Sequence, residues 1–485
     1  FDPGIQPLSD FHLIRKSDAV LLPGDLLRRR GRRKTEKPEK ISGKKKRIEG
    51  EQEENEKRVG NAKQERDRKK GEKIGKERSN LPEYGLIFFA TSRTGYVLTN
   101  ISVLYAPDEL KYVLEKADVE VLIFDTAFED KVAAVAGNLT NIKSLISIGE
   151  SDVKGAVTLD SFMKSSGSHA PAVELHEDDP FCMTYTGGTT GRPKGVLCTH
   201  RARAVTAHTV MVEEAIDERD IVGIVTPLFH VAALNIMFQP AILAGATCVF
   251  LTKWSPEGFL DMVESTAMTA NFMVPTQAAM LLNSSVFDAS RLKTWRKVSF
   301  AGAPMPDWVQ AELIKRLPDL NLTQIYGQSE MGVIAVLRHW YLPEKMGAVG
   351  RMPYNVDVRV VLEDGSEAAP GEIGEVVSRG DNLMREYYNE PKQTEAFFKL
   401  GDGWGWSGDL ATIDEDGFIT LVDRSKDMII SGGENIYPKE IEVVIYEIPE
   451  VAECAVFGIP DDKWGEVPAA YISLKPGANL EEATV

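Results

Sequence analysis

The chain has 485 residues, of which 43% are hydrophobic and 27% are charged, and its net charge is -17 at neutral pH. This length suggests about three core-forming units. The excess negative charge would repel phosphate backbones, which argues against a general nucleic-acid binder. The four cysteines show no paired spacing, which argues against a disulfide scaffold or a zinc site and indicates a reducing, cytoplasmic location.

The charge is concentrated in an atypical segment, residues 28–80. Between Arg28 and Arg78 there are 22 Lys and Arg, 11 Asp and Glu, and only five apolar residues. A segment with so few apolar residues cannot bury enough surface to offset the conformational entropy that it would lose on folding. We therefore expect this segment to be disordered or its residue identities to be unreliable. In particular, we expect residues 72–78 not to form a central buried strand. A basic arm for nucleic acid or lipid is the alternative, but interleaved acids and missing aromatics weaken it.

After Arg78, short apolar stretches alternate with amphipathic ones. Tyr84–Thr91 and Val119–Phe124 read as apolar strands or helix faces. The predicted helices are Asp108–Lys116, Pro256–Ser265 and Asp307–Arg316, and the predicted strands are Val222–Pro227, Thr247–Leu251, Phe272–Pro275 and Lys297–Phe300. This alternation predicts a layered α/β protein with largely parallel sheets.

Two further stretches stand out. Residues 221–252 carry no charge, but proline, glycine and polar residues interrupt them, so we expect a strand, a core helix and a strand rather than a membrane span. Any membrane contact would be peripheral. Beyond Tyr354, short strands at 356–362, 374–378 and 417–421 are separated by Asp-Gly and Pro-Gly turns, which predicts an antiparallel β-rich region.

The strongest local motif is a glycine- and threonine-rich loop. It follows the apolar stretch 181–185, precedes an expected helix at about 199–215, and contains Thr186, Gly187, Gly188, Thr189, Thr190, Gly191 and Lys194. Glycines let backbone N–H groups converge, and the hydroxyls and the lysine add donors, so the loop suits phosphate oxygens. Gly195 after Lys194 disfavours a P-loop kinase or GTPase. A flexible surface loop is the alternative.

Together with five later blocks in the same order, this loop resembles the adenylate-forming superfamily of acyl- and aryl-CoA synthetases, peptide adenylation domains and luciferases. The blocks are Pro227-Leu228-Phe229-His230, Ala301-Gly302-Ala303-Pro304, Gln324–Glu330, Trp406-Ser407-Gly408-Asp409, and Asp423–Asp427 with residues 431–438. The resemblance implies a large N-terminal adenylation domain at 1–424, built of layered α/β subdomains and a β-rich subdomain. It also implies a hinge to a small, truncated α+β C-terminal domain at 425–485.

The resemblance further implies a ligase that converts a carboxylate, ATP and coenzyme A into an acyl-CoA, AMP and pyrophosphate, with Mg²⁺. Thr186, Lys194 and Glu330 would be catalytic, and Glu330 would bind the metal. The nucleotide would also contact Gly302, Ala303, Pro304, Gln324, Tyr326, Gly327, Gln328, Ser329, Asp409 and Arg424. The acyl pocket would include His230, Val231, Leu234, Gly302 and Val333. Lys426 would be the hinge, and Gly432 and Gly433 would border the CoA tunnel.

Several of these residues have structural alternatives. Glu330 could be a solvated loop carboxylate, Tyr326 a core ring, Asp409 a turn residue, Arg424 half of a surface ion pair, and His230 a core histidine. The family's catalytic lysine lies in a segment beyond Val485, so we expect the chain as written to adenylate slowly or not at all.

The substrate is expected to be a small-molecule carboxylate. Small apolar residues at 231–234 and 333–335 favour a fatty acid, with phenylpropenoid or benzoate-type acids second. The segment around Phe229 has no acid to hold an amino-acid ammonium group, which disfavours a peptide adenylation domain. A non-catalytic nucleotide-binding homologue is the other alternative.

Overall fold

The computed structural model describes residues 11–14, 73–77, 81–165, 173–188, 191–303, 305–431, 434–446, 448, 450–461, 464–475 and 477–480. Two compact units divide the chain: the first contains Phe1–Ala204 and Ile216–Ala270, and the second contains Val205–Ala215 and Asn271–Val485. The expected domain boundary after residue 424 lies inside the second unit and stays a prediction.

The first unit alternates strands and helices. Its strands are β1 (Phe11–Ile14), β2 (Lys73–Glu77), β3 (Val97–Ile101), β4 (Val119–Asp125), β5 (Ser144–Ile148), β6 (Ala156–Thr158), β7 (Pro180–Gly188), β8 (Gly191–Thr199), β9 (Ile221–Ile224) and β10 (Thr247–Leu251). Its helices are α2 (Pro82–Thr94), α3 (Pro107–Lys116), η1 (Thr126–Phe128), α4 (Glu129–Ala136), α5 (Leu159–Ser165), η2 (Ala232–Phe238), α7 (Gln239–Ala244) and α8 (Pro256–Thr266), and α6 (His200–Glu213) runs from this unit into the second.

The main sheet of this unit follows the order β8-β7-β3-β2-β4-β5-β6. All neighbours pair in parallel except β7 and β8, as the alternating pattern predicts. The expectation that residues 72–78 cannot form a central strand is wrong, because Lys73–Glu77 pairs with β3 on one side and β4 on the other. Strand pairing uses backbone N–H and C=O groups, which a charged sequence also carries. The rest of the charged segment lies outside the described residues.

An aromatic cluster fills the core beside this sheet. Tyr84–Thr91 belongs to helix α2, which starts with Pro82 and ends at Gly95 in a left-handed conformation (φ 76°). Phe88 of this helix meets Phe181 edge-on at 4.9 Å between ring centroids. Apolar rings buried at such distances supply much of the packing energy of the core.

The uncharged stretch 221–252 folds as expected. It forms β9, the π-helix η2, α7 and then β10, and β9 and β10 pair in parallel. Within the described part of the chain, we find no helix that is both long and apolar enough to cross a membrane.

The second unit holds the remaining elements. Its strands are β11 (Ala270–Met273), β12 (Lys297–Phe300), β13 (Asn321–Gln328), β14 (Gly332–Leu337), β15 (Asp357–Val361), β16 (Gly374–Arg379), β17 (Glu386–Tyr387), β18 (Gly405–Ile413), β19 (Ile419–Arg424), β20 (Ile429–Ser431), β21 (Glu434–Ile436), β22 (Val451–Asp461) and β23 (Gly465–Leu474). Its helices are α9 (Pro275–Asn283), η3 (Ala289–Leu292), α10 (Asp307–Arg316), η4 (His339–Tyr341), α11 (Pro391–Phe397) and α12 (Pro438–Tyr446).

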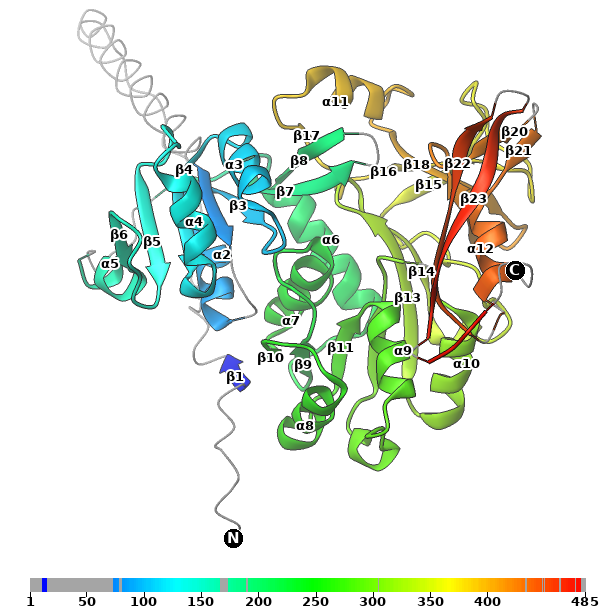
Figure 1. Ribbon diagram of the computed structural model, residues 1–485, viewed down its shortest axis with the longest axis horizontal. Coiled ribbons are helices and arrows are strands. Elements are labelled where there is room, and N and C mark those ends of the chain that lie inside the picture. Colours follow the sequence, from blue (N-terminus) through cyan, green and yellow to red (C-terminus); the bar gives the residue numbers. More distant parts are fainter. Residues whose placement is uncertain are drawn as a thin grey trace, which may run out of the picture. The chain divides into compact units, whose positions relative to one another are not determined.

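Three groups of strands organise this unit. β12 pairs in parallel with β13, and β13 pairs antiparallel with β14. Strands β15, β16, β18 and β19 form a four-stranded antiparallel sheet, which confirms the β-rich region predicted beyond Tyr354. The last group, β21-β20-β23-β22, includes the long antiparallel pair β22 and β23, drawn in red in Figure 1.

A small separate core stabilises the C-terminal strands. Helix α12 packs against β22, and buried Ile429, Ile445, Val451 and Val456 form one apolar cluster there. This lobe therefore has apolar packing of its own next to the turn that leaves β19.

Candidate active site

The glycine- and threonine-rich loop is the tip of the β7–β8 hairpin. Thr186 lies directly opposite Lys194, and Gly188 lies opposite Gly191. Directly opposed residues of antiparallel strands point to the same face, so the Thr186 hydroxyl and the Lys194 ammonium share one face. Thr189 and Thr190, at the tip, lie outside the described residues. The hairpin can therefore offer a hydroxyl and a cation together to an anion.

The helix expected at about 199–215 is present as α6 (His200–Glu213), but a strand that the sequence did not predict lies between the loop and this helix. Strand β8 occupies Gly191–Thr199, and α6 starts only at His200. The residues after the loop pair with β7 through backbone hydrogen bonds, and this pairing is not visible in local sequence. The loop consequently lies at a hairpin tip, and the N-terminal dipole of α6 is not adjacent to it.

The base of this hairpin is braced by residues that sequence reasoning missed. Cys182 and Cys198 are buried and lie opposite each other on β7 and β8. The buried guanidinium of Arg203 donates from Nε to the Cys182 Sγ at 3.3 Å and from Nη2 to the Cys198 Sγ at 3.0 Å. A β-carbon at Gly195 would lie 2.6 Å from the Met183 Sδ, so a side chain at this position would have to displace Met183.

In the second unit, a cluster forms around the buried carboxylate of Asp409. Its Oδ2 accepts hydrogen bonds from the Tyr326 hydroxyl at 2.6 Å and from the Gln328 Nε2 at 2.7 Å. The Arg424 Nε lies 3.4 Å from Oδ1, and Asp409 and Arg424 are opposite each other on β18 and β19. Burial, followed by the Asp409 charge, raises the pKa of Tyr326, so its phenol stays protonated. The structure thus brings together four predicted nucleotide residues.

Strand β13 fixes the positions of two side chains of this cluster. Tyr326 and Gln328 belong to β13, and Gln328 also donates from Nε2 to the Ser407 carbonyl oxygen at 2.8 Å. Between them, a side chain at Gly327 would collide with the Gly332 carbonyl oxygen. A glycine is required there because β13 and β14 approach so closely.

The remaining nucleotide-motif residues flank β12 and β13. Gly302 follows β12 with φ +90° and is exposed, as is Ala303, while Pro304 lies outside the described residues. Gln324 is half-buried on β13 opposite Phe300. The exposed backbone at 302–303 is open to a planar ligand, which is consistent with the predicted adenine-side turn.

Glu330 is half-buried just beyond β13 and is held by one later segment. Its Oε1 accepts a hydrogen bond from the Tyr387 hydroxyl at 2.9 Å, and its main-chain oxygen accepts one from the Met384 N–H at 2.6 Å. Ser329 beside it is also half-buried. Sequence reasoning missed Tyr387, because the 57 positions that separate it from Glu330 hide the contact.

Glu330 is the residue that the sequence predicts to bind magnesium. Among the described residues, no three His, Cys, Asp or Glu side chains gather closely enough to form a metal cage. Magnesium characteristically takes one or two protein carboxylates plus substrate phosphates. A half-buried Glu330 whose Oε1 is already oriented fits that mode of binding, since a second protein carboxylate is not required.

His230 lies just before the π-helix η2. Its Nδ1 accepts the Ala232 N–H at 3.2 Å, so the neutral ring carries its proton on Nε2. The ring is exposed, but the surrounding protein desolvates it and lowers its pKa. Val231 and Leu234 are buried, as is Val333 in the second unit. Short π-helical segments such as η2 often occur at functional sites.

The turn that the sequence predicts to be a hinge follows directly after Arg424. Lys426 is exposed, and the Ser425 N–H donates to the Gly408 oxygen at 2.9 Å. Gly432 and Gly433 lie outside the described residues. Beyond them, the Lys439 Nζ donates to the Leu421 oxygen at 2.7 Å, and the Lys439 N–H donates to the Asp423 Oδ2 at 3.0 Å. Burial lowers the pKa of Lys439. This lysine fastens α12 to β19.

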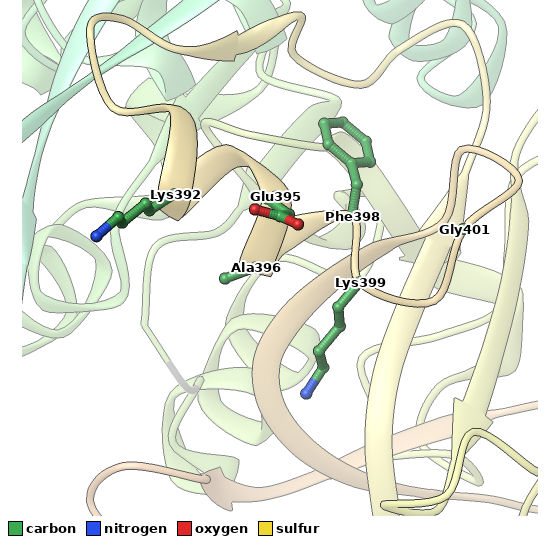
Figure 2. Close-up of a pocket in the computed structure, with 6 residues that line it drawn as sticks. All are labelled: Lys392, Glu395, Ala396, Phe398, Lys399 and Gly401. Carbon is green, nitrogen blue, oxygen red and sulfur yellow. The ribbon is translucent and has the colours of Figure 1, made fainter.

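A cavity of about 500 Å³ lies against α11 and contains none of the predicted site residues. Its walls come from Lys392, Glu395, Ala396, Phe398, Lys399 and Gly401, and Figure 2 shows these residues along α11 and the loop that follows it. It is open and lined by charged groups, so it differs from the apolar acyl pocket that the sequence predicts.

Two family matches agree with this geometry. Residues 28–388 match the AMP-binding enzyme family, and residues 440–485 match the AMP-binding enzyme C-terminal domain. The chain therefore belongs to the AMP-binding, adenylate-forming enzyme family, which confirms the resemblance and the α/β fold class. Within that family it is an AMP-forming acid–thiol ligase of the acyl-CoA synthetase type.

Individual relatives cover most of the chain. A feruloyl-CoA synthase from Amycolatopsis sp. is 35% identical over 417 residues, which is 85% of this chain and 80% of the relative. The medium/long-chain-fatty-acid–CoA ligase FadD8 of Mycobacterium tuberculosis is 32% identical, over 86% of this chain and 73% of its own. The crystal structure of ATP-bound MatB from Rhodopseudomonas palustris superposes with a TM-score of 0.77 at 28% identity, covering 85% of this chain and 80% of that one.

Proposed function

We propose that this ligase activates an apolar carboxylic acid, with a medium- or long-chain fatty acid as the first candidate. The carboxylate oxygen attacks the α-phosphorus of ATP, and pyrophosphate leaves. The thiol of coenzyme A then attacks the acyl carbonyl of the adenylate, and AMP leaves. The observation that carries the proposal is the buried Asp409 carboxylate, surrounded by Tyr326, Gln328 and Arg424.

Asp409 would hold the ribose of the nucleotide. A buried carboxylate that is fixed by two hydrogen bonds to one oxygen can accept ribose hydroxyls at its other oxygen. Arg424 contacts that oxygen at a long 3.4 Å, and its own side chain is 58% exposed, so it can turn towards the sugar. The Tyr326 ring, held by its hydroxyl, would present its face to adenine.

The anionic groups of ATP would be held by cations and donors of the hairpin and by magnesium. Thr186 and Lys194, side by side, would bind phosphate oxygens. Glu330 would be the protein ligand of Mg²⁺, and the bound ion would neutralise phosphate charge. These groups act by positioning and by stabilising charge, because none of them needs to become a covalent nucleophile.

The acid would occupy a pocket near His230. With its proton on Nε2, the neutral ring can donate a hydrogen bond to a carboxylate, and the apolar side chains of Val231 and Leu234 suit a hydrocarbon tail. An arylpropenoic acid is the second candidate, because a relative at 35% identity is named feruloyl-CoA synthase. The hinge at Lys426 would let the C-terminal lobe, including Gly432 and Gly433, turn towards the bound thiol between the two steps.

A substrate panel tests this proposal. Purified protein that includes the family's C-terminal catalytic lysine is incubated with ATP, Mg²⁺ and coenzyme A, with hexanoate, palmitate, ferulate, indoleacetate or phenylalanine, and AMP and CoA esters are quantified. We expect the highest kcat/KM for a fatty acid and none for phenylalanine. Preference for ferulate or indoleacetate would establish the aryl candidate. ATP binding by calorimetry without AMP from any acid would instead favour a non-catalytic nucleotide-binding protein.

A further inference from the structure

Both ends of Glu330 are held by the segment 384–387. The Met384 N–H fixes the main-chain oxygen of Glu330, and the Tyr387 hydroxyl fixes its Oε1. Among the described residues, Tyr387 is the one side chain that donates a hydrogen bond to this carboxylate. Glu330 is thus held at its main-chain oxygen and at Oε1, and these two contacts determine where the second carboxylate oxygen, Oε2, lies.

Tyr387 is itself fixed by helix α11. Its N–H donates to the Thr394 Oγ1 at 3.0 Å, and its ring meets Phe397 edge-on at 6.0 Å and 82°. These two contacts orient the ring, and its hydroxyl donates to the Glu330 carboxylate.

We propose that Tyr387 is a positioning residue that presents the Glu330 carboxylate to magnesium, which rests on the metal-binding role proposed for Glu330. A free glutamate must give up rotamer freedom when it binds a metal. Glu330 has already lost part of that freedom, because Oε1 is engaged and Oε2 remains for the ion. Carboxylates that bind metals are commonly held in this way by outer hydrogen bonds.

The test is ATP affinity measured by calorimetry, with and without Mg²⁺, on Tyr387→Phe. The variant keeps the ring against Phe397 and removes only the donor. We expect ATP to bind roughly tenfold more weakly in the presence of Mg²⁺ and unchanged in EDTA, because loss of an outer hydrogen bond typically costs at least tenfold in metal affinity. Tyr354→Phe, at a ring that is 64% exposed, is the matched control and should change neither value.

A double-mutant cycle with Glu330→Gln separates this inference from the proposed function. We expect Glu330→Gln to weaken Mg²⁺-dependent ATP binding, and Tyr387→Phe to add nothing in that background. If Glu330→Gln has no effect, the metal-binding role of Glu330 is wrong. Two other outcomes would show that only the role of Tyr387 is wrong. In the first, Glu330→Gln weakens binding but Tyr387→Phe does not. In the second, Tyr387→Phe still weakens binding in the Glu330→Gln background. Comparing each variant with and without Mg²⁺ also removes any effect of altered folding.

Discussion

The Tyr326 hydroxyl and the Asp409 carboxylate are joined by a hydrogen bond of 2.6 Å between residues 83 positions apart. This contact ties β13 to β18 and places an aromatic ring next to a buried acid. Because the hydroxyl is engaged at the ring's edge, the ring face is oriented by the same bond that orients the carboxylate. The two motifs on these strands therefore form one structural unit.

Replacing Asp409 by asparagine should weaken ATP binding selectively at the ribose. An amide offers a poorer acceptor to the sugar hydroxyls, and hydrogen bonds to charged groups contribute about 1.5–3 kcal/mol. We expect roughly tenfold or greater loss of ATP affinity by calorimetry, with little change for 2′,3′-dideoxy-ATP. Equal losses for both nucleotides would show that Asp409 acts only through protein structure.

His230→Ala should lower kcat/KM for the acid at least tenfold and leave ATP affinity unchanged. The ring would donate from Nε2 to the substrate carboxylate, and alanine has no donor. Since desolvation lowers the pKa of His230, the neutral form should persist below the usual value of 6.5, and activity should fall only at lower pH. The control is His176→Ala, at an exposed loop histidine. Loss of ATP binding in His230→Ala would contradict an acyl-pocket role.

Lys439→Met should loosen the contact between α12 and β19. The variant loses the Nζ hydrogen bond to the Leu421 oxygen and keeps the apolar stem of the side chain. We expect faster tryptic cleavage after Lys426 by intact mass, while Lys475→Met, which removes another lysine of the C-terminal lobe, should cleave at the wild-type rate. An unchanged cleavage rate in Lys439→Met would show that this contact does not restrain the hinge.

The sequence alone predicted the site residues that belong to short contiguous motifs and the elements that have a clear apolar period. The β13 and β18 motifs supplied Tyr326, Gln328 and Asp409, which the fold then brings together. The alternating pattern also predicted the parallel sheet of the first unit, because apolar strands and amphipathic helices have different periods.

The features that sequence reasoning missed depend on distant partners. Strand β2 is specified by neighbours on both sides, so its own charged residues gave no signal. Strand β8 exists because β7 is available to pair with it, and this pairing places the glycine- and threonine-rich loop at a hairpin tip. Tyr387 and Arg203 act on residues that are not adjacent in sequence, and nothing in their local patterns indicates those contacts.

One buried acid outside the proposed chemistry gives the protein a pH-dependent stability. Glu214 follows α6 and is 6% exposed. Burial raises its pKa from 4.5 to about 7, opposed by the Ser299 hydroxyl and assisted by the Glu213 charge. Between these two pH values the folded protein keeps a proton that the unfolded chain has lost. Its stabilising contribution is therefore complete below pH 4.5 and is lost as the pH rises through about 7.

Glu214→Gln should remove this loss, because glutamine is neutral and nearly isosteric. At about pH 8 we expect the variant to exceed the wild type in free energy of unfolding by up to about 3 kcal/mol, with a flatter pH profile in urea titrations. Glu218→Gln, at an exposed position of the loop that follows, is the matched control and should change the free energy of unfolding by less than about 0.5 kcal/mol. If Glu214→Gln is no more stable than the wild type above pH 7, the buried carboxylate is already ionised without cost, and its raised pKa is wrong.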